Sequence, residues 1–432
     1  MKTLILDGSA AHDLMAARVS AALQDQLEGC GWDYETVAVR EMKIGNCAGD
    51  FFCWVRNPGV CNVNDDNRVI AKKIVQSDLV VYLTPVTFGG YSSELKRMVD
   101  HQIQDISPMF AIVNGEIHHQ KRYASYPNLL AIGWMPEANP QAESIFRHLV
   151  QRNALNMYSK TTVCGVVIGQ PSNSDLIAQT GSWIAATASA SSSPAPALPT
   201  QPASLAEAAP VRRAVLLVGS PRTKKSTSAS LGDYLFEQLQ TRGVEAQTFY
   251  LHTTVSSAER MQNLYSALDS ADLVVLAFPL YVDSLPAPVL SALEKIAAHR
   301  ALNPTPARFA AIANCGFPEA RHNDTALAIC AEFARAAGFD WMGSLSLGGG
   351  EGLIHGALLK EMDGRAISIM KSLEIAAEAL AVGKPIPQPA RDMLAKTVIP
   401  NWLYRLFGGF GWKRQAKRYG VNDLLARPYR KN

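Results

Sequence analysis

Short apolar segments alternate with helical patterns along this chain. The segments are apolar at successive positions, as in strands that are buried on both faces of a parallel sheet. Leu231, Leu235 and Leu239 form one stripe of a predicted helix from about residue 228 to 241, and Gly243 follows its end. The predicted strands include residues 4–6, 79–83, 214–218, 273–277 and 309–313. This alternation predicts a doubly wound α/β fold.

The pattern occurs twice. Residues 77–85 (SDLVVYLTP) and 271–279 (ADLVVLAFP) share a polar start, an apolar strand and a proline at the strand exit. In the same order, residues 4–9 correspond to 215–220 and residues 133–138 to 316–320, which pairs Ile132 with Cys315. Three matched landmarks predict two tandem domains with parallel sheets.

A change of composition marks the boundary between the domains. Residues 187–210 are rich in alanine, serine and proline, have little to bury, and are typical of a flexible, partly extended linker. We therefore expect domains at residues 1–186 and 211–390, with a separate basic and aromatic tail at 391–432.

Composition narrows the class of protein. The 432 residues carry a net charge of +3, which does not suggest a nucleic-acid binder. No apolar run reaches the roughly 20 residues of a membrane-spanning helix, and no basic and apolar leader precedes the first strand. Seven cysteines fit a reducing compartment better than a disulfide framework. We expect a cytoplasmic protein.

The turn at residues 219–228 (GSPRTKKSTS) follows the first strand of the second domain and enters a helix. Its hydroxyls, backbone amides and Arg222 suit a phosphate at a helix amino end. A polar helix cap with solvated lysines is the alternative, and the place after the first strand favours phosphate. The loop matches neither the nucleoside-triphosphate P-loop nor the dinucleotide-binding glycine motif.

Three loops of the second domain resemble those of the flavodoxin-like NAD(P)H-dependent FMN reductases: residues 219–228, residues 279–286 (PLYVDSLP) and residues 314–319 (NCGFPE). The resemblance implies two tandem flavodoxin-like domains, FMN as cofactor and NADH or NADPH as electron donor. The implied phosphate-binding residues are Ser220, Arg222, Ser226, Thr227 and Ser228. The residues implied to frame the flavin are Pro279, Leu280, Tyr281, Val282, Asn314, Cys315, Gly316 and Phe317.

The first domain is similar to iron-sulfur flavoproteins and other multimeric flavodoxin-like oxidoreductases. The similarity rests on Cys47, Cys53 and Cys61, followed by residues 85–96 and Asp100. Relatives often have a second cysteine where this chain has Asp50. Three thiolates and a carboxylate can ligate a four-iron cluster, but no Cys-x-x-Cys pair is present. We therefore expect no metal, and a cysteine-bearing loop beside a flavin or at a domain interface.

The phosphate turn of the first domain is altered. Residues 8–13 keep Ser9 but lack the Pro-Arg pair, and Asp13 would repel a phosphate unless the helix amino end or a neighbouring cation compensates. The later loop resembles the intact type, with Pro85, Val86, Thr87, Phe88 and Gly89 as the candidate flavin-binding residues. The first domain is expected to bind FMN weakly, to bind it in another pose, or to serve as a lid and pairing partner for the second domain. The family resemblance implies an intrachain pseudo-dimer or a homodimer.

Two further groups carry candidate chemistry. His118, His119, Arg122 and Tyr123 can protonate a substrate oxygen or hold an anion, or they form ordinary hydrogen bonds in a polar excursion. Cys315 is a candidate nucleophile by position, but the equivalent Ile132 shows that no thiol is required there. We expect Cys315 to be part of the flavin wall.

The tail at residues 399–419 alternates aromatic and basic residues. Such a segment can lie on an anionic membrane surface, or it can dock onto the first domain or a second chain. Because Gly408, Gly409 and Gly411 are expected to break a helix, we favour docking over membrane contact.

Taken with the resemblance, these patterns indicate an FMN-dependent oxidoreductase that passes electrons from NADH or NADPH to a small acceptor, such as a quinone or a flavin. The alternatives are an electron-transfer flavoprotein with an iron-sulfur centre and a non-catalytic flavin-binding assembly protein. The sequence leaves open the acceptor and the preferred nicotinamide.

Overall fold

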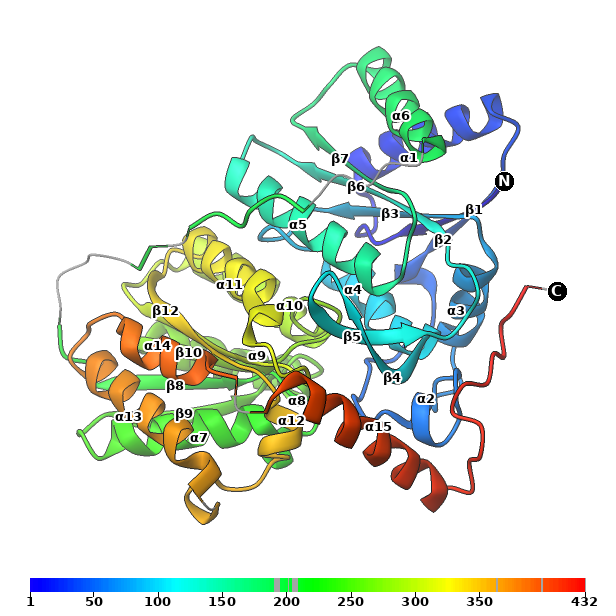
Figure 1. The fold of residues 1–432 in the computed structure, drawn as a ribbon. Helices are drawn as coiled ribbons and strands as arrows, with labels where there is room; N and C mark the ends of the chain where they lie inside the picture. Colours follow the sequence, from blue (N-terminus) through cyan, green and yellow to red (C-terminus); the bar gives the residue numbers. More distant parts are fainter. Residues whose placement is uncertain (190–194, 201, 204–208, 363, 398, 432) are drawn as a thin grey trace. The chain divides into compact units, whose positions relative to one another are not determined.

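The computed structural model describes residues 1–189, 195–200, 202–203, 209–362, 364–397 and 399–431 (Figure 1). The chain divides into two compact units. The first unit contains Met1–Ala197 and Arg405–Asn432, and the second contains Leu198–Tyr404. Residues 190–194, 201 and 204–208 of the predicted linker lie outside the described residues.

The first unit is built on a parallel five-stranded sheet. Its strands, in spatial order, are β2 (Asp33–Ala38), β1 (Lys2–Asp7), β3 (Leu79–Pro85), β6 (Asn128–Met135) and β7 (Thr162–Ile168). Helices α1 (Leu14–Gly29) and α6 (Asn173–Ala188) cover one face, and α3 (Asn67–Gln76), α4 (Ser93–Val99) and α5 (Pro140–Asn156) cover the other (Figure 1). An antiparallel hairpin, β4 (Ile106–Val113) and β5 (Glu116–Lys121), is inserted between β3 and β6. The segment that contains Cys47, Cys53 and Cys61 includes the short helix α2 (Phe52–Val55).

The second unit repeats this plan. Its strand order is β12 (Asp340–Leu347), β11 (Arg308–Asn314), β10 (Leu273–Pro279), β8 (Arg213–Val218) and β9 (Glu245–Tyr250), all parallel. Helices α7 (Thr227–Gln240), α13 (Ile367–Ala381) and α14 (Gln388–Ala395) share one apolar core with the sheet. Helices α9 (Ala258–Asp269), α10 (Ala287–Leu302) and α11 (Asp324–Ala336) complete the unit (Figure 1).

When the five parallel strands of each unit are numbered 1 to 5 in chain order, their spatial order in the sheet is 2-1-3-4-5, which is the flavodoxin-like doubly wound arrangement. The predicted fold class and its tandem repetition are therefore confirmed. In such sheets ligands bind outside the carboxyl ends of the strands, next to the point where the strand order reverses. A ligand is therefore expected to contact the loops that follow the first, third and fourth strands of each unit.

One landmark of the predicted repeat is wrong by three residues. Pro85 at the end of β3 is paired with Trp134, and Pro279 at the end of β10 is paired with Asn314. Trp134 is therefore the counterpart of Asn314, and Met135, not Ile132, is the counterpart of Cys315. The glycine at position 133 misled the alignment, because it lies inside strand β6 and not in the loop after it.

The expected helix break in the tail is also wrong. Helix α15 runs without interruption from Asn401 to Arg418. Gly408 has a packing role, since a Cβ there would lie 2.4 Å from Cε2 of Phe110. The glycine lets the helix approach the β4–β5 hairpin closely, which offsets its low helix propensity.

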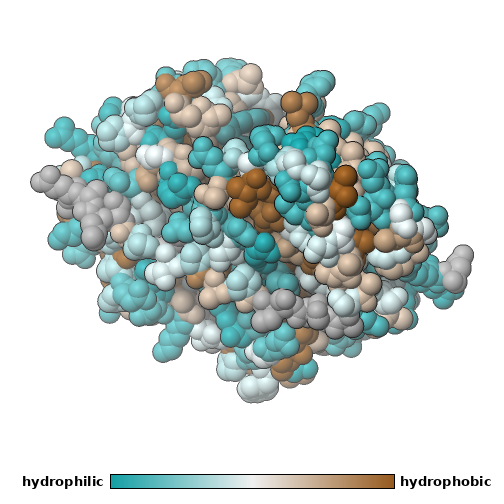
Figure 2. All heavy atoms as spheres, turned by 90° about the horizontal axis from the view of Figure 1, so that it is seen from above, coloured by the Kyte–Doolittle hydropathy of each residue, from teal (hydrophilic) through white to brown (hydrophobic). Residues whose placement is uncertain are grey.

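The surface seen in Figure 2 is mostly hydrophilic, with apolar side chains in separate small groups. Among the described residues, none of the helices is both long enough and apolar enough to span a bilayer.

Candidate functional site

The first loop of the second unit connects β8 to α7. Gly219 is required where the strand ends, because a Cβ would lie 2.6 Å from Cγ2 of Val289 and 2.9 Å from Cβ of Phe278. Ser226 is the N-cap of α7, and its hydroxyl accepts from the amide of Ala229 at 3.1 Å. Ser220, Ser226, Thr227 and Ser228 are all buried. Neutral hydroxyls therefore surround this helix amino end, where the helix dipole favours an anion.

Arg222 is held by a carboxylate that sequence reasoning missed. Its guanidinium makes a bidentate ion pair with Glu351, with one bond of 2.8 Å from Nη1 to Oε1. Glu351 lies in α12 (Gly350–Leu353), and its Oε1 is also 2.8 Å from Nδ1 of His355. Burial acts to raise the pKa of Glu351, but the bonds from Arg222 and the nearby His355 outweigh it and lower the pKa. The ion pair with Glu351 fixes the guanidinium of Arg222 within the predicted phosphate loop.

The second loop begins at Pro279 and makes a tight turn. Tyr281 and Ser284 exchange backbone hydrogen bonds of 2.9 and 3.1 Å. Val282 and Asp283 between them have φ values of 45° and 57°. A β-branched residue in the left-handed region is strained, and such strain is concentrated at ligand sites and switch regions. Pro279, Leu280, Tyr281 and Val282 are only half-buried, so their side chains remain accessible.

The third loop is joined to the other two through Asn314. Its Nδ2 donates to Oγ of Ser228 at 2.9 Å and to the carbonyl of Phe278 at 3.0 Å, while its own carbonyl accepts from the amide of Leu280 at 2.8 Å. Asn314 therefore connects the three predicted cofactor loops at one end of the sheet: its side-chain amide bonds to Ser228 and to the end of β10, and its backbone carbonyl bonds to Leu280.

Cys315 is buried and its thiol is bonded to a backbone carbonyl, that of Phe317, at 3.3 Å. Burial raises the pKa of the thiol to about 12, so it is protonated at neutral pH and unsuited to nucleophilic attack. Gly316 is exposed and Phe317 half-buried beside it. The first turn of α15 also contacts this loop, since Tyr404 Oη donates to the carbonyl of Gly316 at 2.7 Å.

In the first unit the corresponding helix amino end is occupied by the chain itself. Oδ1 of Asp13 accepts from the amides of Met15 and Ala16, both at 3.0 Å. The indole Nε1 of Trp134 donates to Oδ2 of the same carboxylate at 3.1 Å. A carboxylate thus occupies the amide donors to which a phosphate would bind, and an indole stands in the position of Asn314.

Ser9 is engaged in the same way. Its amide donates to Oδ1 of Asp7 at 2.9 Å, and its hydroxyl accepts from Arg40 at 3.2 Å. Arg40 also pairs with the Asp7 carboxylate at 2.6 Å, a bond that raises the pKa of the guanidinium. The carboxylates of Asp7 and Asp13 therefore accept hydrogen bonds from the backbone amides of Ser9, Met15 and Ala16.

The second loop of the first unit nevertheless repeats the geometry of its counterpart. Thr87 and Gly90 exchange backbone hydrogen bonds of 2.9 and 2.7 Å, with φ of 52° at Phe88 and 80° at Gly89. Val86 donates its amide to the carbonyl of Trp134 at 3.0 Å, as Leu280 does to Asn314. Pro85, Val86, Thr87 and Phe88 are half-buried. The turn after the third strand therefore has the same geometry in both units, whereas the loops after the first strand differ.

The three cysteines of the first unit lie near one another. Burial raises the pKa of Cys47 to about 12 and that of Cys53 well above its usual value; Cys47 and Cys61 add to the second shift electrostatically. Sγ of Cys61 is 3.7 Å from Nδ1 of His101. Asp50, in the place of a fourth cysteine, is exposed and accepts from the amide of Phe52 at 3.0 Å. Of the three cysteines, Cys53 is packed in an apolar cluster that also contains Ala416 and Leu424 of the C-terminal segment.

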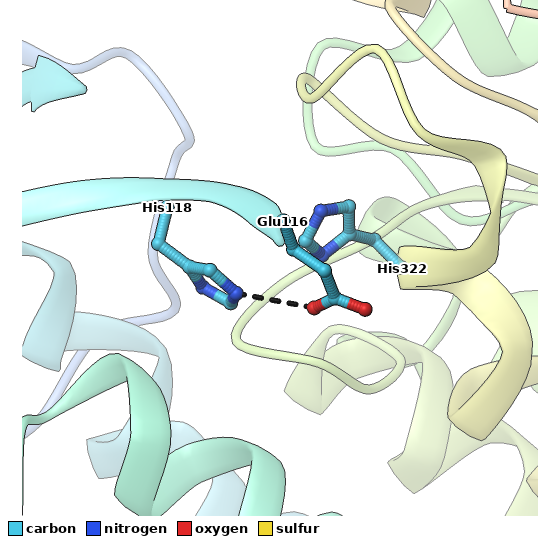
Figure 3. Close-up of side chains that lie close together, drawn as sticks. All are labelled: Glu116, His118 and His322. Carbon is cyan, nitrogen blue, oxygen red and sulfur yellow. Dashed lines mark hydrogen bonds and ion pairs between the residues drawn. The ribbon is translucent and has the colours of Figure 1, made fainter. Parts of the chain in front are cut away.

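The candidate acid–base residues have structural partners. Nε2 of His118 is 3.2 Å from Oε2 of Glu116 (Figure 3), and its Nδ1 is 2.7 Å from Oδ1 of Asn156. The ring of His119 lies 4.5 Å from that of Trp54 and 5.2 Å from that of Phe110. Burial, with a smaller effect of His118, lowers the pKa of His119 to about 3.

Arg122 and Tyr123 are also buried. The guanidinium of Arg122 donates to the carbonyls of Ile106, Leu424 and Ala426, at 3.2, 3.1 and 2.8 Å. It ties the C-terminal segment to the base of the hairpin. The bonds to Leu424 and Ala426 could not be read from the sequence, because they join residues 302 and 304 positions apart.

Comparison with known proteins places these features in context. The family described as NADPH-dependent FMN reductase matches residues 1–116 and 212–340. An iron-sulfur flavoprotein of Methanocaldococcus jannaschii is 31% identical over 70 residues, which are 16% of this chain and 35% of that protein. An iron-sulfur flavoprotein of Archaeoglobus fulgidus is 26% identical over 103 residues, which are 24% of this chain and 46% of that protein. The chain thus spans less than half the length of these curated relatives.

Two solved structures are also similar. The NAD(P)H:quinone oxidoreductase of Methanothermobacter marburgensis is 13% identical, with a TM-score of 0.32 and coverage of 40% of this chain and 96% of that one. An FMN-dependent NADH-azoreductase of Bacillus anthracis is 14% identical, with a TM-score of 0.30 and coverage of 39% and 100%.

Proposed function

Because the chain belongs to the NADPH-dependent FMN reductase family, we propose that its second unit binds FMN and that the chain passes electrons from NADPH or NADH to a small acceptor such as a quinone or a free flavin. The observation that carries this proposal is the junction made by Asn314. It holds the phosphate loop, the strained turn and the third loop together at the carboxyl end of the sheet.

The residues of the second unit fit FMN chemically. The hydroxyls of Ser226, Thr227 and Ser228 and the amino end of α7 offer neutral donors to a phosphate, and Arg222 adds a positive charge. The half-buried residues of the 279–282 loop and Phe317 supply apolar contact for a ring system. When bound, FMN supplies the redox chemistry, so the protein's task is to position the nicotinamide and exclude water. No side chain needs to act as an acid or base for hydride transfer.

We propose that the first unit does not bind FMN phosphate. Asp13 already accepts from two amides of the helix amino end, and a phosphate there would meet its negative charge. Trp134 further fixes that carboxylate with its indole. The first unit then serves as a pairing partner for the second, in one chain or in a homodimer.

The purified chain is expected to contain, or to take up on reconstitution, one FMN. Anaerobic addition of NADPH should bleach the flavin absorbance, and an added quinone should restore it. The measurement is the amount of FMN released per chain, followed by an absorption spectrum before and after NADPH. Asp13→Ala should cost about 1 kcal/mol of stability, because it removes the side-chain cap of α1.

Two FMN per chain would contradict the assignment of the first unit. No FMN even after reconstitution would overturn the cofactor proposal for both units. Bound FMN that NADPH reduces only slowly, with no acceleration by any acceptor, would favour the non-catalytic assembly protein.

A specific observation supports a second candidate, an electron-transfer flavoprotein with an iron-sulfur cluster. Cys47, Cys53 and Cys61 lie within electrostatic range of one another, and the two curated relatives are iron-sulfur flavoproteins. The fit is incomplete, because Asp50 replaces a thiolate and the buried thiols must lose protons to bind metal. Iron and acid-labile sulfide in anaerobically purified protein would support this candidate, and their absence after reconstitution would exclude it.

His119 is expected to affect stability and not catalysis. Its pKa is about 3 in the folded chain and about 6.5 in the unfolded chain. Between these values only the unfolded chain binds the proton, so stability falls as the pH falls through this window. In His119→Phe the loss between pH 7 and 4.5 should be smaller by about 2 kcal/mol.

The comparison is made by urea unfolding at the two pH values, with NADPH oxidation measured across the same range. His12→Asn is the control: it removes an exposed histidine, and between the two pH values its free energy of unfolding should fall by as much as that of the parent. A changed pH profile of NADPH oxidation in His119→Phe would instead restore His119 as a catalytic candidate.

A further inference from the structure

Helix α15, whose first four residues belong to the second unit and whose other residues belong to the first, has an exposed apolar face. Trp402, Leu406 and Phe410 follow one another at intervals of four residues, so they lie on one side of the helix. Their exposed fractions are 69%, 64% and 67%, and the adjacent Phe407 is 62% exposed. Four large apolar side chains on two and a half turns of one helix form a continuous apolar surface, unlike single exposed residues elsewhere.

Another side of α15 makes the packing contacts. Gly408 is closely packed against Phe110, as noted above. The ring of Trp412 lies 5.2 Å from that of Phe51 and 5.1 Å from that of Trp54, and Ala416 is 1% exposed. These residues recur every four positions on a side of their own. The exposed apolar face is therefore not needed to hold the helix in place.

The charges of α15 are all of one sign. Lys413 and Lys417 continue the exposed face toward its carboxyl end, since they follow Phe410 by three and seven residues. The other exposed basic residues are Arg405, Arg414 and Arg418. No aspartate or glutamate occurs from residue 393 to 422. The helix thus has a mainly apolar amino-terminal half and a strongly basic carboxyl-terminal half.

We propose that this face of α15 docks on the surface of an anionic phospholipid bilayer. The helix lies along the interface, where the aromatic rings and Leu406 enter the boundary between headgroups and acyl chains and the lysines and arginines meet phosphate groups. The unbroken helix removes the reason for which sequence reasoning favoured docking over membrane contact. Its apolar content is too low for it to cross the bilayer.

The charge pattern argues against other occupants. A second copy that placed α15 against α15 would bring five cations of each helix together with no acid to compensate them. A nucleic acid would pair with the basic half but would leave Trp402, Leu406 and Phe410 in water. An anionic lipid surface can contact both halves of the helix, because its acyl chains accept the apolar side chains and its phosphates accept the basic ones.

The test is co-sedimentation of the full chain with phosphatidylcholine vesicles and with vesicles that also contain phosphatidylglycerol. Binding is expected only to the anionic vesicles and should weaken as salt is raised. Leu406→Asp and Phe410→Asp should each weaken binding by about tenfold or more, because each removes a large apolar group from the interface. Leu302→Asp is the matched control, since Leu302 is 83% exposed on α10 and should bind as the parent does.

Circular dichroism and thermal unfolding establish that the variants are folded, and Phe410→Ala replaces Phe410→Asp if they show otherwise. Absence of binding to anionic vesicles would overturn the proposal, as would equal binding by the parent and the folded variants of Leu406 and Phe410. A parent that is dimeric by light scattering and a Phe410→Asp variant that is monomeric would overturn it in favour of a second copy.

Discussion

Replacement of Arg222 by alanine is expected to weaken FMN binding by about 10- to 100-fold, because a charge-assisted hydrogen bond to a phosphate contributes about 1.5–3 kcal/mol. The ion pair with Glu351 keeps the guanidinium beside the loop in the absence of a phosphate. The same pair places the carboxylate of Glu351 near the expected position of the phosphate. Glu351→Gln should therefore strengthen FMN binding by a few fold, since it removes a competing negative charge while keeping the shape of the side chain.

The dissociation constant is measured by quenching of FMN fluorescence on titration with the apoprotein. Arg242→Ala is the control, because Arg242 follows the far end of α7 and bonds only locally, to Gln238 and Thr241. Unchanged binding in Arg222→Ala would contradict the placement of the phosphate. Weaker binding in Glu351→Gln would show that Glu351 acts by orienting Arg222 and not by competing with the ligand.

Replacement of Lys96 by methionine is expected to lower the free energy of unfolding of the first unit by about 3–5 kcal/mol. The ammonium of Lys96 in α4 and the carboxylate of Asp100, the residue that follows the helix, form an ion pair, and their side chains are 0% and 1% exposed. Removing the cation takes the positive charge of Lys96 away from a buried carboxylate, which is costly in a medium of low polarity.

Urea unfolding followed by tryptophan fluorescence measures this loss. Lys73→Met is the matched control, because the pair between Lys73 and Glu35 is partly exposed and should contribute less than about 1 kcal/mol. A double variant, Lys96→Met with Asp100→Leu, should recover much of the loss, since apolar residues can replace a buried pair at little cost. A loss in Lys96→Met no greater than that in Lys73→Met would contradict the assignment of a buried pair.

Much of the fold followed from local patterns. The doubled strand with its terminal proline at residues 79–85 and 273–279 predicted the third strand of both sheets. The apolar stripe of Leu231, Leu235 and Leu239 predicted α7 to within a residue at each end. The predicted cofactor loops of the second unit do lie at strand ends, because strand-to-helix connections in such a sheet leave at one edge.

The differences between the two units were less visible. Asp13 was expected to repel a phosphate, but its bonds to the amino end of its own helix and to Trp134 appear only in the structure. The predicted equivalence of Cys315 and Ile132 was wrong because it rested on similar residue types in the two segments. The strand register, which pairs Pro279 with Asn314 and Pro85 with Trp134, was not available from the sequence. Propensity likewise argued against a helix through Gly408, whose lack of a Cβ is what the packing on Phe110 requires.

The sequence by itself determined the class of sheet, the duplication and the positions of the loops, because these depend on periodicity and turn residues that act over a few positions. Only the tertiary structure decided which groups fill those loops. Glu351 reaches Arg222 from 129 residues away, and Arg122 bonds to Leu424 across 302 residues. Such partners are selected by chain folding and burial, which bring distant polar groups together because a buried group without a partner is costly.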